Sequence, residues 1–241
     1  MIAAIVGAKD GYYNYFAELE TAGKCVEWVK DHLALDEIDI YLDKSHDLRR
    51  GKGDIEKVYT NLFEYMAAVI SEVPAGSNGV IFTPWLHGNR CPFEDPNARG
   101  MFFNISLDTG KSEMIRAVYE GVCFHLRWFL ETQEKKIQTS KTLRFVGGGA
   151  LSDVTCQILA DCTGRTVETV ESPQNIGAVG AAITIAVGTG IIDDITQAKK
   201  LIPAAKTFIP DYSLKSVYDR NYEAYVNLYK SNKKIFALLN G

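Results

Sequence analysis

A run of glycines in the second half of the chain has the composition of a phosphate-binding turn. This glycine turn, residues 147–150, reads Gly-Gly-Gly-Ala and lies between a predicted strand at 142–146 and a helical pattern that begins at Ser152. Glycine lets the backbone turn tightly and lets a ligand approach the main chain with no Cβ in the way. A helix that follows directs its unpaired N–H groups and its positive dipole end toward the turn. The spacing is therefore suited to binding phosphate.

The residues alone leave a second interpretation of the glycine turn open. Glycines between a strand and a helix are equally typical of a tight structural turn. The turn matches neither G-x-G-x-x-G nor the phosphate loop G-x-x-x-x-G-K-[ST], the two commonest nucleotide motifs. Composition and spacing do not choose between a phosphate site and a purely structural turn.

Further motifs stand in a fixed order along the chain. They are Thr21-Ala22-Gly23-Lys24-Cys25-Val26-Glu27-Trp28, Asp95-Pro96-x-Ala98-Arg99-Gly100, Gly100-x-Phe102-x-Asn104-Ile105, Glu113-Met114-x-x-Ala117-Val118-Tyr119-Glu120, Gly147-Gly148-Gly149-Ala150-x-Ser152, Gln157-x-x-Ala160-Asp161-x-x-Gly164 and Gly177-Ala178-x-Gly180-Ala181-Ala182. In order and spacing this set resembles the C-terminal half of the FGGY carbohydrate kinases, from about Tyr12 onward. One position departs from the pattern, since Asn104 stands where the family signature usually has glycine.

The resemblance implies the fold and the domain organisation. It implies an α/β domain of the actin-like (ribonuclease H-like) fold, a mixed sheet flanked by helices, forming the C-terminal half of a two-domain sugar kinase. In that family ATP lies mainly against the C-terminal domain, while the sugar and the aspartate general base lie on the N-terminal domain. We therefore expect residues 1–241 to be a single nucleotide-binding domain. By the same resemblance, we expect the N-terminal sugar-binding domain and the Gly-Thr phosphate-contact segment to lie outside these 241 residues.

The resemblance also assigns nucleotide contacts, residue by residue. They are Gly23, Glu27, Gly148, Gly149, Ala150 and Asp153. Gly23 and Glu27, four residues apart, share one helix face. Glu27 and Asp153 stand where glycerol kinases have a neutral amide, so we expect their carboxylates to face the adenine or ribose end rather than the phosphates. We assign no catalytic residue and no metal ligand.

Each assigned position also has a structural interpretation. Gly23 would allow close helix packing, Glu27 would be a surface acid, and Asp153 would complement the helix dipole. Gly177 and Gly180 are expected to let their helix press closely on the sheet.

The activity implied is transfer of the γ-phosphoryl group of ATP, with Mg²⁺, to a hydroxyl of D-xylulose or a related ketose or polyol. Gly88-Asn89-Arg90-Cys91-Pro92 is nearer to the xylulose and gluconate kinases than to glycerol kinase. Because the general base and the sugar site are missing, we expect the chain alone to be inactive as a kinase and to bind nucleotide weakly. The alternative is a non-catalytic actin-like nucleotide-binding or assembly module.

Composition bounds the remaining possibilities. The 241 residues are 46% hydrophobic and 23% charged, which excludes a disordered or collagen-like chain. The net charge of −4 shows no basic excess, so we expect no nucleic-acid partner. No apolar run approaches eighteen residues, so we expect no membrane span. The first residues lack the basic leader of a secretory signal, and we expect a cytoplasmic protein.

Cysteine and histidine spacing gives no sign of a metal centre. The five cysteines include no C-x-x-C pair and are expected to be buried free thiols. The four histidines are scattered, which suggests no metal cluster. His125 lies beside the apolar stripe of a predicted helix and is expected to be a packed histidine.

Periodicity and turn residues predict the elements that position these residues. We expect helices over 18–33, 54–72, 112–136, 152–162 and 176–187, strands over 80–83, 100–107, 142–146 and 166–170, an extended segment over 12–16, and helix in the tail 211–239. Asp54 is the expected N-cap of the second helix, which would direct Leu62, Tyr65 and Val69 inward. Residues 36–53 are expected to be an exposed connection.

The ordered, proline-rich loop over 84–99 raises the question of self-association. We expect Trp85, Leu86 and Phe93 to form an exposed apolar patch and to drive a homo-oligomer. The alternative is that the loop folds back on its own domain. A tyrosine stripe (Tyr218, Tyr222, Tyr225 and Tyr229) is then expected to pack on the domain body or on another subunit. Arg99 is expected to hold the loop structurally rather than to bind substrate.

Overall fold

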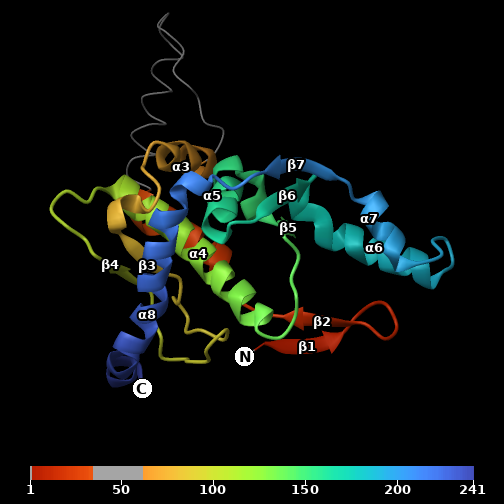
Figure 1. Ribbon diagram of the computed structural model, residues 1–241, viewed down its shortest axis with the longest axis horizontal. Helices are drawn as coiled ribbons and strands as arrows, with labels where there is room; N and C mark the ends of the chain where they lie inside the picture. The colour runs from red at the N-terminus through yellow and green to blue at the C-terminus, as the bar shows by residue number, and fades with distance from the viewer. Residues whose placement is uncertain (1, 35–61) are drawn as a thin grey trace, which may run out of the picture.

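The computed structural model of the chain describes residues 2–34 and 62–241 (Figure 1). The expected connection over 36–53 and the expected N-cap Asp54 lie outside the described residues. The described helices are α1 (Ala22–Val29), α3 (Leu62–Ser71), α4 (Lys111–Glu134), α5 (Asp153–Thr163), α6 (Ile176–Gly188), α7 (Ala198–Leu201) and α8 (Lys215–Asn240). Short helical turns are η1 (Lys30–Ala34), η2 (Ser77–Gly79), η3 (Gly148–Leu151), η4 (Pro173–Asn175), η5 (Ile195–Gln197) and η6 (Tyr212–Leu214).

The described strands form three separate sheets. They are β1 (Ala3–Val6), β2 (Tyr13–Phe16), β3 (Ile81–Thr83), β4 (Met101–Phe103), β5 (Thr142–Arg144), β6 (Thr166–Val170) and β7 (Ala204–Phe208). Strands β1 and β2 form an antiparallel hairpin, and β3 pairs antiparallel with β4. The third sheet has the order β5–β6–β7, in which β5 is parallel and β7 antiparallel to β6. It is the expected mixed sheet, and it carries the glycine turn at the end of β5.

Helix α4 lies at the centre of the molecule and packs on β3, α1, α3, α5 and α8 (Figure 1). Its start is stabilised by the Glu113 carboxylate, which accepts the Gly110 N–H at 3.1 Å. Where α4 crosses β3, a Cβ built on Gly121 would lie 2.2 Å from the Phe82 carbonyl oxygen. The helix and the strand lie this close only because residue 121 is glycine.

Most predicted elements have the expected type and nearly the expected bounds. The strand over 166–170 is β6, and the helices over 112–136, 152–162 and 176–187 are α4, α5 and α6. The first helix begins at Ala22 rather than residue 18 and continues as the π-helical turn η1. Strands β1 and β7 were not predicted. Both are short and lie largely exposed, so neither shows the alternation of a half-buried strand.

The strand predicted over 100–107 is much shorter, because the chain turns at Asn104. This residue has a φ of +66°, in the left-handed region that ends β4. Asparagine tolerates that region better than most residues, and its amide donates to the Gly79 carbonyl at 3.1 Å. The departure from the family glycine is therefore compatible with the backbone at this turn.

The inward face of α3 differs from the prediction. Met66 and Ile70 are fully buried, whereas Tyr65 and Val69 are half-buried. The prediction was therefore wrong by one residue of rotation. The helix packs on both α4 and α5, and Arg116 of α4 donates to the Ile70 carbonyl at 2.7 Å. These contacts set the rotation of α3 about its axis. They cannot be predicted from the spacing of apolar residues within α3 itself.

The proline-rich loop folds back on its own domain, so the expected exposed patch around Trp85 is wrong. Trp85 has no exposed surface and packs edge-on against Phe93, Tyr229 and Phe236. Leu86 and Phe93 are partly buried against the same core. Arg99 donates to the Pro96 and Ala98 carbonyls, each at 2.8 Å, and so stabilises the loop from within.

The tyrosine stripe is a packing face against the body of the domain. Tyr218, Tyr222, Tyr225 and Tyr229 are all buried on α8. Their hydroxyl groups are hydrogen-bonded to other elements: Tyr222 to Glu131 at 2.8 Å and Tyr229 to Asp95 at 3.1 Å. The stripe therefore attaches α8 to α4 and to the proline-rich loop, and it is not free to contact another subunit.

His125 is a packed histidine, as expected. Its Nε2 lies 2.7 Å from the Cys91 carbonyl oxygen, which can only accept, so we assign the proton to Nε2. Nδ1 then accepts from the Tyr225 hydroxyl at 2.7 Å and from the Trp85 indole N–H at 3.4 Å. Burial lowers the pKa of His125 to about 4, against the opposing effect of the Cys91 carbonyl. The ring is therefore neutral near pH 7.

This depressed pKa predicts a loss of stability in mild acid. In the unfolded chain His125 takes up a proton near pH 6.5, while the folded state resists protonation until about pH 4. The free energy of unfolding should therefore fall as the pH drops from 6.5 toward 4, by about 3 kcal/mol in total. Urea titrations at pH 7, 6 and 5 measure how the free energy of unfolding changes with pH. His125→Gln should reduce this pH dependence by the equivalent of one proton taken up on unfolding. An unchanged slope in the variant would contradict the assignment.

The five cysteines are free and buried, as predicted. Burial raises the pKa of the Cys25 thiol to about 12 and that of Cys156 to about 11. Both thiols are therefore protonated and unreactive near neutral pH. Across residues 2–34 and 62–241, no helix combines the length and the apolarity needed to cross a membrane.

Candidate functional site

The glycine turn connects the end of β5 to the start of α5. Gly147 has a φ of +91°, and its N–H donates to the Pro173 carbonyl at 2.9 Å. Ser152 is the N-cap of α5, and its hydroxyl accepts the Thr155 N–H at 3.3 Å. The predicted helix start is therefore confirmed. The left-handed backbone at Gly147 is a conformation that glycine adopts without strain.

The turn presents unobstructed backbone to solvent. Gly148 and Gly149 are exposed, while Ala150 is buried. A Cβ at Gly148 would meet nothing within 4 Å, and one at Gly149 would meet only the Phe145 ring, at 3.0 Å. The Gly148 and Gly149 amides begin η3, and so they have no acceptor within that turn of helix. These donors and the N-terminus of α5 together offer an anion several N–H groups in one place.

Asp153, in the first turn of α5, is paired with a lysine that the sequence did not single out. Lys206 on β7 places its ammonium nitrogen 2.8 and 2.9 Å from the two Asp153 carboxylate oxygens. Both side chains are more than half exposed, so the pair adds little to stability. The lysine does offset the negative charge beside the turn. It was missed because β7 was missed.

Gly23 and Glu27 lie on α1, which is fixed by its contacts with the proline-rich loop. The Thr21 hydroxyl and the Cys25 thiol both donate to the Pro84 carbonyl. Gly23 is exposed, and a Cβ there would meet nothing within 4 Å, so helix packing does not require this glycine. Glu27 forms an exposed ion pair with Lys24 at 2.7 Å and, through that hydrogen bond, raises the pKa of the lysine.

The structure places the six candidate residues in two groups. Both α1 and α5 pack against α4, which carries the two groups on one scaffold. Within the described part of the chain, no hydrogen bond or ion pair joins Glu27 to Asp153 or to the glycine turn. The candidates therefore form an open surface rather than a walled pocket.

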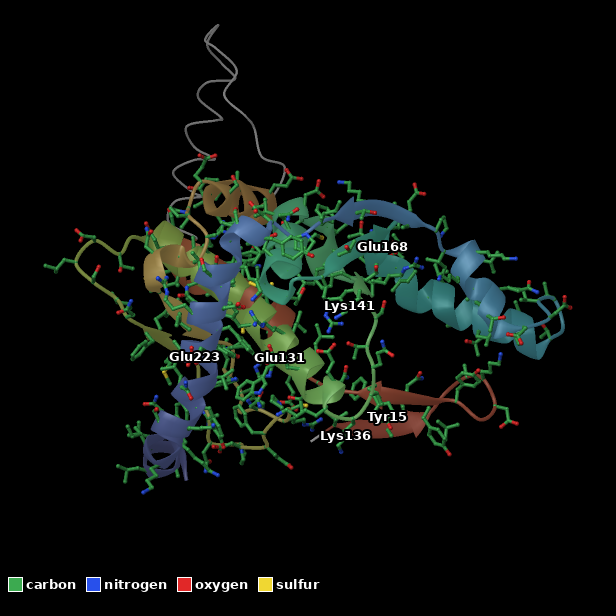
Figure 2. All side chains as sticks on the ribbon, in the orientation of Figure 1. Tyr15, Glu131, Lys136, Lys141, Glu168 and Glu223 are labelled. Carbon is green, nitrogen blue, oxygen red and sulfur yellow. The ribbon has the colours of Figure 1, made fainter. Side chains whose placement is uncertain are left out.

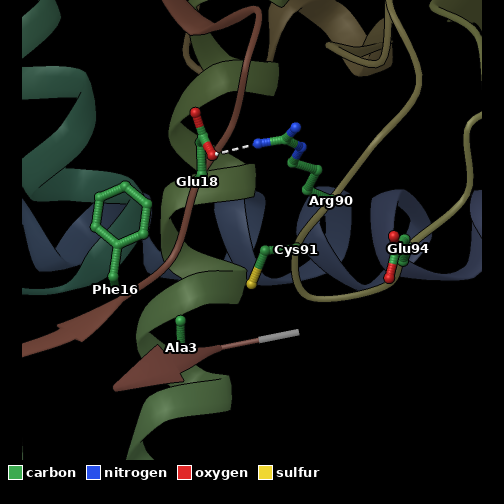
Figure 3. Close-up of a pocket in the computed structure, with 6 residues that line it drawn as sticks. All are labelled: Ala3, Phe16, Glu18, Arg90, Cys91 and Glu94. Carbon is green, nitrogen blue, oxygen red and sulfur yellow. Dashed lines mark hydrogen bonds and ion pairs between the residues drawn. The ribbon is translucent and has the colours of Figure 1, made fainter. Parts of the chain in front are cut away.

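Two shallow cavities lie elsewhere. The first, of about 170 Å³, is lined by Ala3, Phe16, Glu18, Arg90, Cys91 and Glu94 (Figure 3). There Arg90 pairs with Glu18 at 3.0 Å and with Glu20 at 2.6 Å. The second, of about 330 Å³, lies between the β1–β2 hairpin and η5 and is lined by Gly7, Ala8, Lys9, Tyr12, Asn14, Ile195 and Thr196. Neither cavity includes a candidate nucleotide contact.

Metal-ligating side chains do not gather in the described residues. No group of three or more His, Cys, Asp or Glu side chains is placed to hold a metal ion in residues 2–34 and 62–241. Mg²⁺ is commonly bound by substrate phosphates, water and one or two carboxylates rather than by a dedicated protein cage. The site is thus compatible with a metal that arrives with the nucleotide.

Solved structures with the same architecture are sugar kinases. The chain superposes on a ligand-bound xylulose kinase from Lactobacillus acidophilus with a TM-score of 0.81 and 22% identity, over 99% of this chain and 43% of that one. It superposes on a Plasmodium falciparum glycerol kinase with ADP with a TM-score of 0.69 and 19% identity, over 94% of this chain and 41% of that one. The fold is the actin-like (ribonuclease H-like) α/β fold of these kinases.

The model of the FGGY family of carbohydrate kinases, C-terminal domain, matches residues 4–189, and the chain belongs to this family. It is 27% identical to xylulose kinase of Bacillus subtilis (strain 168) over 230 residues, 95% of this chain and 41% of that protein. It is 28% identical to L-xylulose/3-keto-L-gulonate kinase of Escherichia coli (strain K12) over 167 residues, 69% of this chain and 33% of that protein. The chain thus spans about 40% or less of the length of these relatives.

Proposed function

We propose that residues 1–241 form the nucleotide-binding half of an ATP-dependent carbohydrate kinase whose acceptor is D-xylulose or a related ketose or polyol. The observation that carries the proposal is the open glycine turn at the N-terminus of α5, with exposed Gly148 and Gly149. Membership of the FGGY family supports phosphoryl transfer to a sugar. The names of the relatives, xylulose kinase and L-xylulose/3-keto-L-gulonate kinase, favour a ketose.

In this proposal the chain binds and orients the nucleotide. The Gly148 and Gly149 amides and the first N–H groups of α5 donate to phosphate oxygens, which they can approach because no Cβ intervenes. Lys206 offsets the charge of Asp153, so the carboxylate does not repel the phosphates. Mg²⁺ supplies charge neutralisation on the phosphates when bound. Gly23 and Glu27 on α1 are proposed to contact the adenine or ribose end.

We propose that the chain alone transfers no phosphate to sugar, because the general base and the sugar site lie on another domain. A coupled assay with MgATP and a panel of ketoses is expected to show no turnover above the protein-free rate. Sugar-dependent turnover that a substitution within this chain abolishes would overturn this expectation. Nucleotide binding that is never accompanied by turnover, even with a sugar-binding domain added, would favour a non-catalytic nucleotide-binding module.

A substitution at Gly148 tests the location of the nucleotide. In Gly148→Val the new side chain projects into space that is empty of protein, so it should block the ligand without disturbing the fold. Calorimetric titration with MgADP should show at least about tenfold weaker binding, equivalent to 1.4 kcal/mol. Gly188→Val, at another glycine with nothing near its Cβ, is the matched control and should bind like the wild type. Equal affinity in the two variants would place the nucleotide away from the turn.

A further inference from the structure

Lys206 lies on β7, at the edge of the three-stranded sheet from which the glycine turn emerges. In the pairing of β7 with β6 it stands opposite Thr169, one residue before β6 ends. Because β5 and β6 are parallel, their carboxyl ends meet at one edge of the sheet, and the glycine turn follows β5 at this edge. Ligands of α/β sheets commonly bind outside the carboxyl ends of the parallel strands. The strand register therefore brings Lys206 to the glycine turn.

The side chain of Lys206 reaches the first residue of α5. Its ammonium nitrogen lies 2.8 and 2.9 Å from the two carboxylate oxygens of Asp153. An ammonium group has three N–H donors, and this pair uses two of them. The side chains of Lys206 and Asp153 are 59% and 58% exposed, so an incoming ligand can reach the ammonium group. Lys206 is therefore a cation that is held beside the glycine turn and still has one donor available.

The charge of Lys206 acts on the glycine turn as well as on Asp153. Burial is the main cause of the raised pKa of the Cys156 thiol in α5; Asp153 raises this pKa further, and Lys206 lowers it. The Cys156 thiol donates to the carbonyl of Ala150, the last residue of the turn, at 3.7 Å. The ammonium group is thus close enough to interact with an anion bound at the turn.

A second element next to the glycine turn, helix α6, supplies no cation. The Gly147 N–H donates to the Pro173 carbonyl, which joins the turn to η4 and so to the start of α6. None of the α6 residues is charged. The glycines of α6 were expected to let it press closely on the sheet, and that expectation is wrong, because a Cβ at Gly177 or Gly180 would meet nothing within 4 Å. The positive charge beside the turn therefore comes from Lys206 rather than from α6.

Two other cations of this sheet, Arg144 and Lys141, have different positions. The Arg144 guanidinium at the end of β5 donates to the Ile202 carbonyl at 2.8 Å and lies 3.4 Å from the Glu168 carboxylate. Neither contact involves α5 or the glycine turn. Lys141 immediately precedes β5, at the end of the strand opposite to the turn (Figure 2, which also labels Glu168). Lys141 is therefore a matched control for Lys206 on the same sheet.

We propose that Lys206 binds the phosphate groups of the nucleotide directly, donating its third N–H to a phosphate oxygen while Asp153 holds the ammonium group in place. This inference rests on the proposed function, in which phosphate lies against the glycine turn. It goes beyond the offsetting of charge, because it makes the lysine a ligand of the phosphate. Lysine ammonium groups are common phosphate ligands and act as point charges. The backbone amides of the turn fix the position of the phosphate, and Lys206 adds a full positive charge, which amides lack.

A double-mutant cycle separates direct binding from the offsetting of charge. If Lys206 only offsets Asp153, its removal has little effect once residue 153 is neutral. If Lys206 binds phosphate, Lys206→Met weakens MgADP binding about tenfold in the wild type and again in an Asp153→Asn background. Any contact that Asp153 itself makes with the nucleotide cancels, because both proteins in the second comparison lack it. NMR titrations of the full chain, followed by its amide signals, measure these affinities even where binding is weak.

Further variants and a second ligand are the controls. Lys206→Arg keeps the charge and should recover most of the affinity, while Lys141→Met should bind MgADP like the wild type. Adenosine, which has no phosphate, should bind equally to the wild type and to Lys206→Met. The melting temperature of Lys206→Met should be unchanged, because the ion pair between Lys206 and Asp153 is exposed.

Two results would overturn the inference. One is an effect of Lys206→Met below about twofold in the Asp153→Asn background, which would make the lysine only a counter-charge for Asp153. The other is an equal loss of affinity for adenosine and for MgADP, which would show that the substitution acts away from the phosphates. In either case, binding of MgADP that Gly148→Val still weakens would leave the proposed function standing. Binding that Gly148→Val does not weaken would count against the proposed function and remove this inference with it.

Discussion

Replacing Arg116 by methionine is expected to lower the free energy of unfolding by about 3–5 kcal/mol, because it leaves a buried carboxylate without its counter-charge. The Arg116 guanidinium lies 2.8 Å from Glu120, whose side chain is only 1% exposed. It also donates to the Ile70 carbonyl at 2.7 Å and to the Tyr218 hydroxyl at 3.1 Å. One side chain thus links α4 to α3 and α8.

The same carboxylate organises the turn that precedes β3. Glu120 accepts the Gly76 N–H at 2.9 Å and the Ser77 hydroxyl at 2.8 Å. Chemical unfolding in urea measures the effect, and Lys24→Met is the control, since the exposed Lys24–Glu27 pair should contribute less than about 1 kcal/mol. Adding Glu120→Gln to Arg116→Met should recover part of the loss, because the buried charge is then removed. A loss below about 1 kcal/mol in Arg116→Met would contradict the buried network.

Trp85→Ala is expected to cost about 3–5 kcal/mol of stability, the range for removing a large aromatic side chain from a core. The Trp85 ring lies 5.3 to 6.2 Å, centroid to centroid, from rings of the proline-rich loop and of α8. Its N–H also donates to His125 at 3.4 Å. Removing it would open a cavity between the loop and α8 and leave the His125 network with one donor fewer.

Thermal and urea unfolding of Trp85→Ala check this expectation. Tyr212→Ala, at an aromatic side chain that is largely exposed, is the control and should change stability by less than about 0.5 kcal/mol. The oligomeric state of Trp85→Ala gives a second readout. If the variant remained fully stable but lost a self-association that the wild type shows, Trp85 would be a surface residue, contrary to the structure.

The sequence alone determined the family, the order of the elements and the location of the glycine turn. These depend on local patterns: glycines before a helix, the Ser152 cap, and the strand-forming residues of β6, Thr-Val-Glu-Thr-Val. Each pattern involves only a few consecutive residues, because capping and turn geometry act within one helical turn. Asn104 was recognised as a departure from a family glycine, and the left-handed backbone there gives the physical reason that glycine or asparagine is suited to it.

Tertiary structure alone decided what is buried and what meets at the site. Trp85 was predicted to be exposed because the face toward an absent partner domain was expected to be uncovered, whereas the packing of α8 against the loop encloses it. Lys206 reaches Asp153 across 53 residues of sequence, through a strand with no clear pattern of its own. For helix α6 the error was the opposite one. Its apolar sequence predicts burial, but the helix is largely exposed, because a sequence does not identify the element that would cover it. Burial depends on contacts between elements. The sequence of one segment therefore determines its own secondary structure more fully than the elements that pack against it.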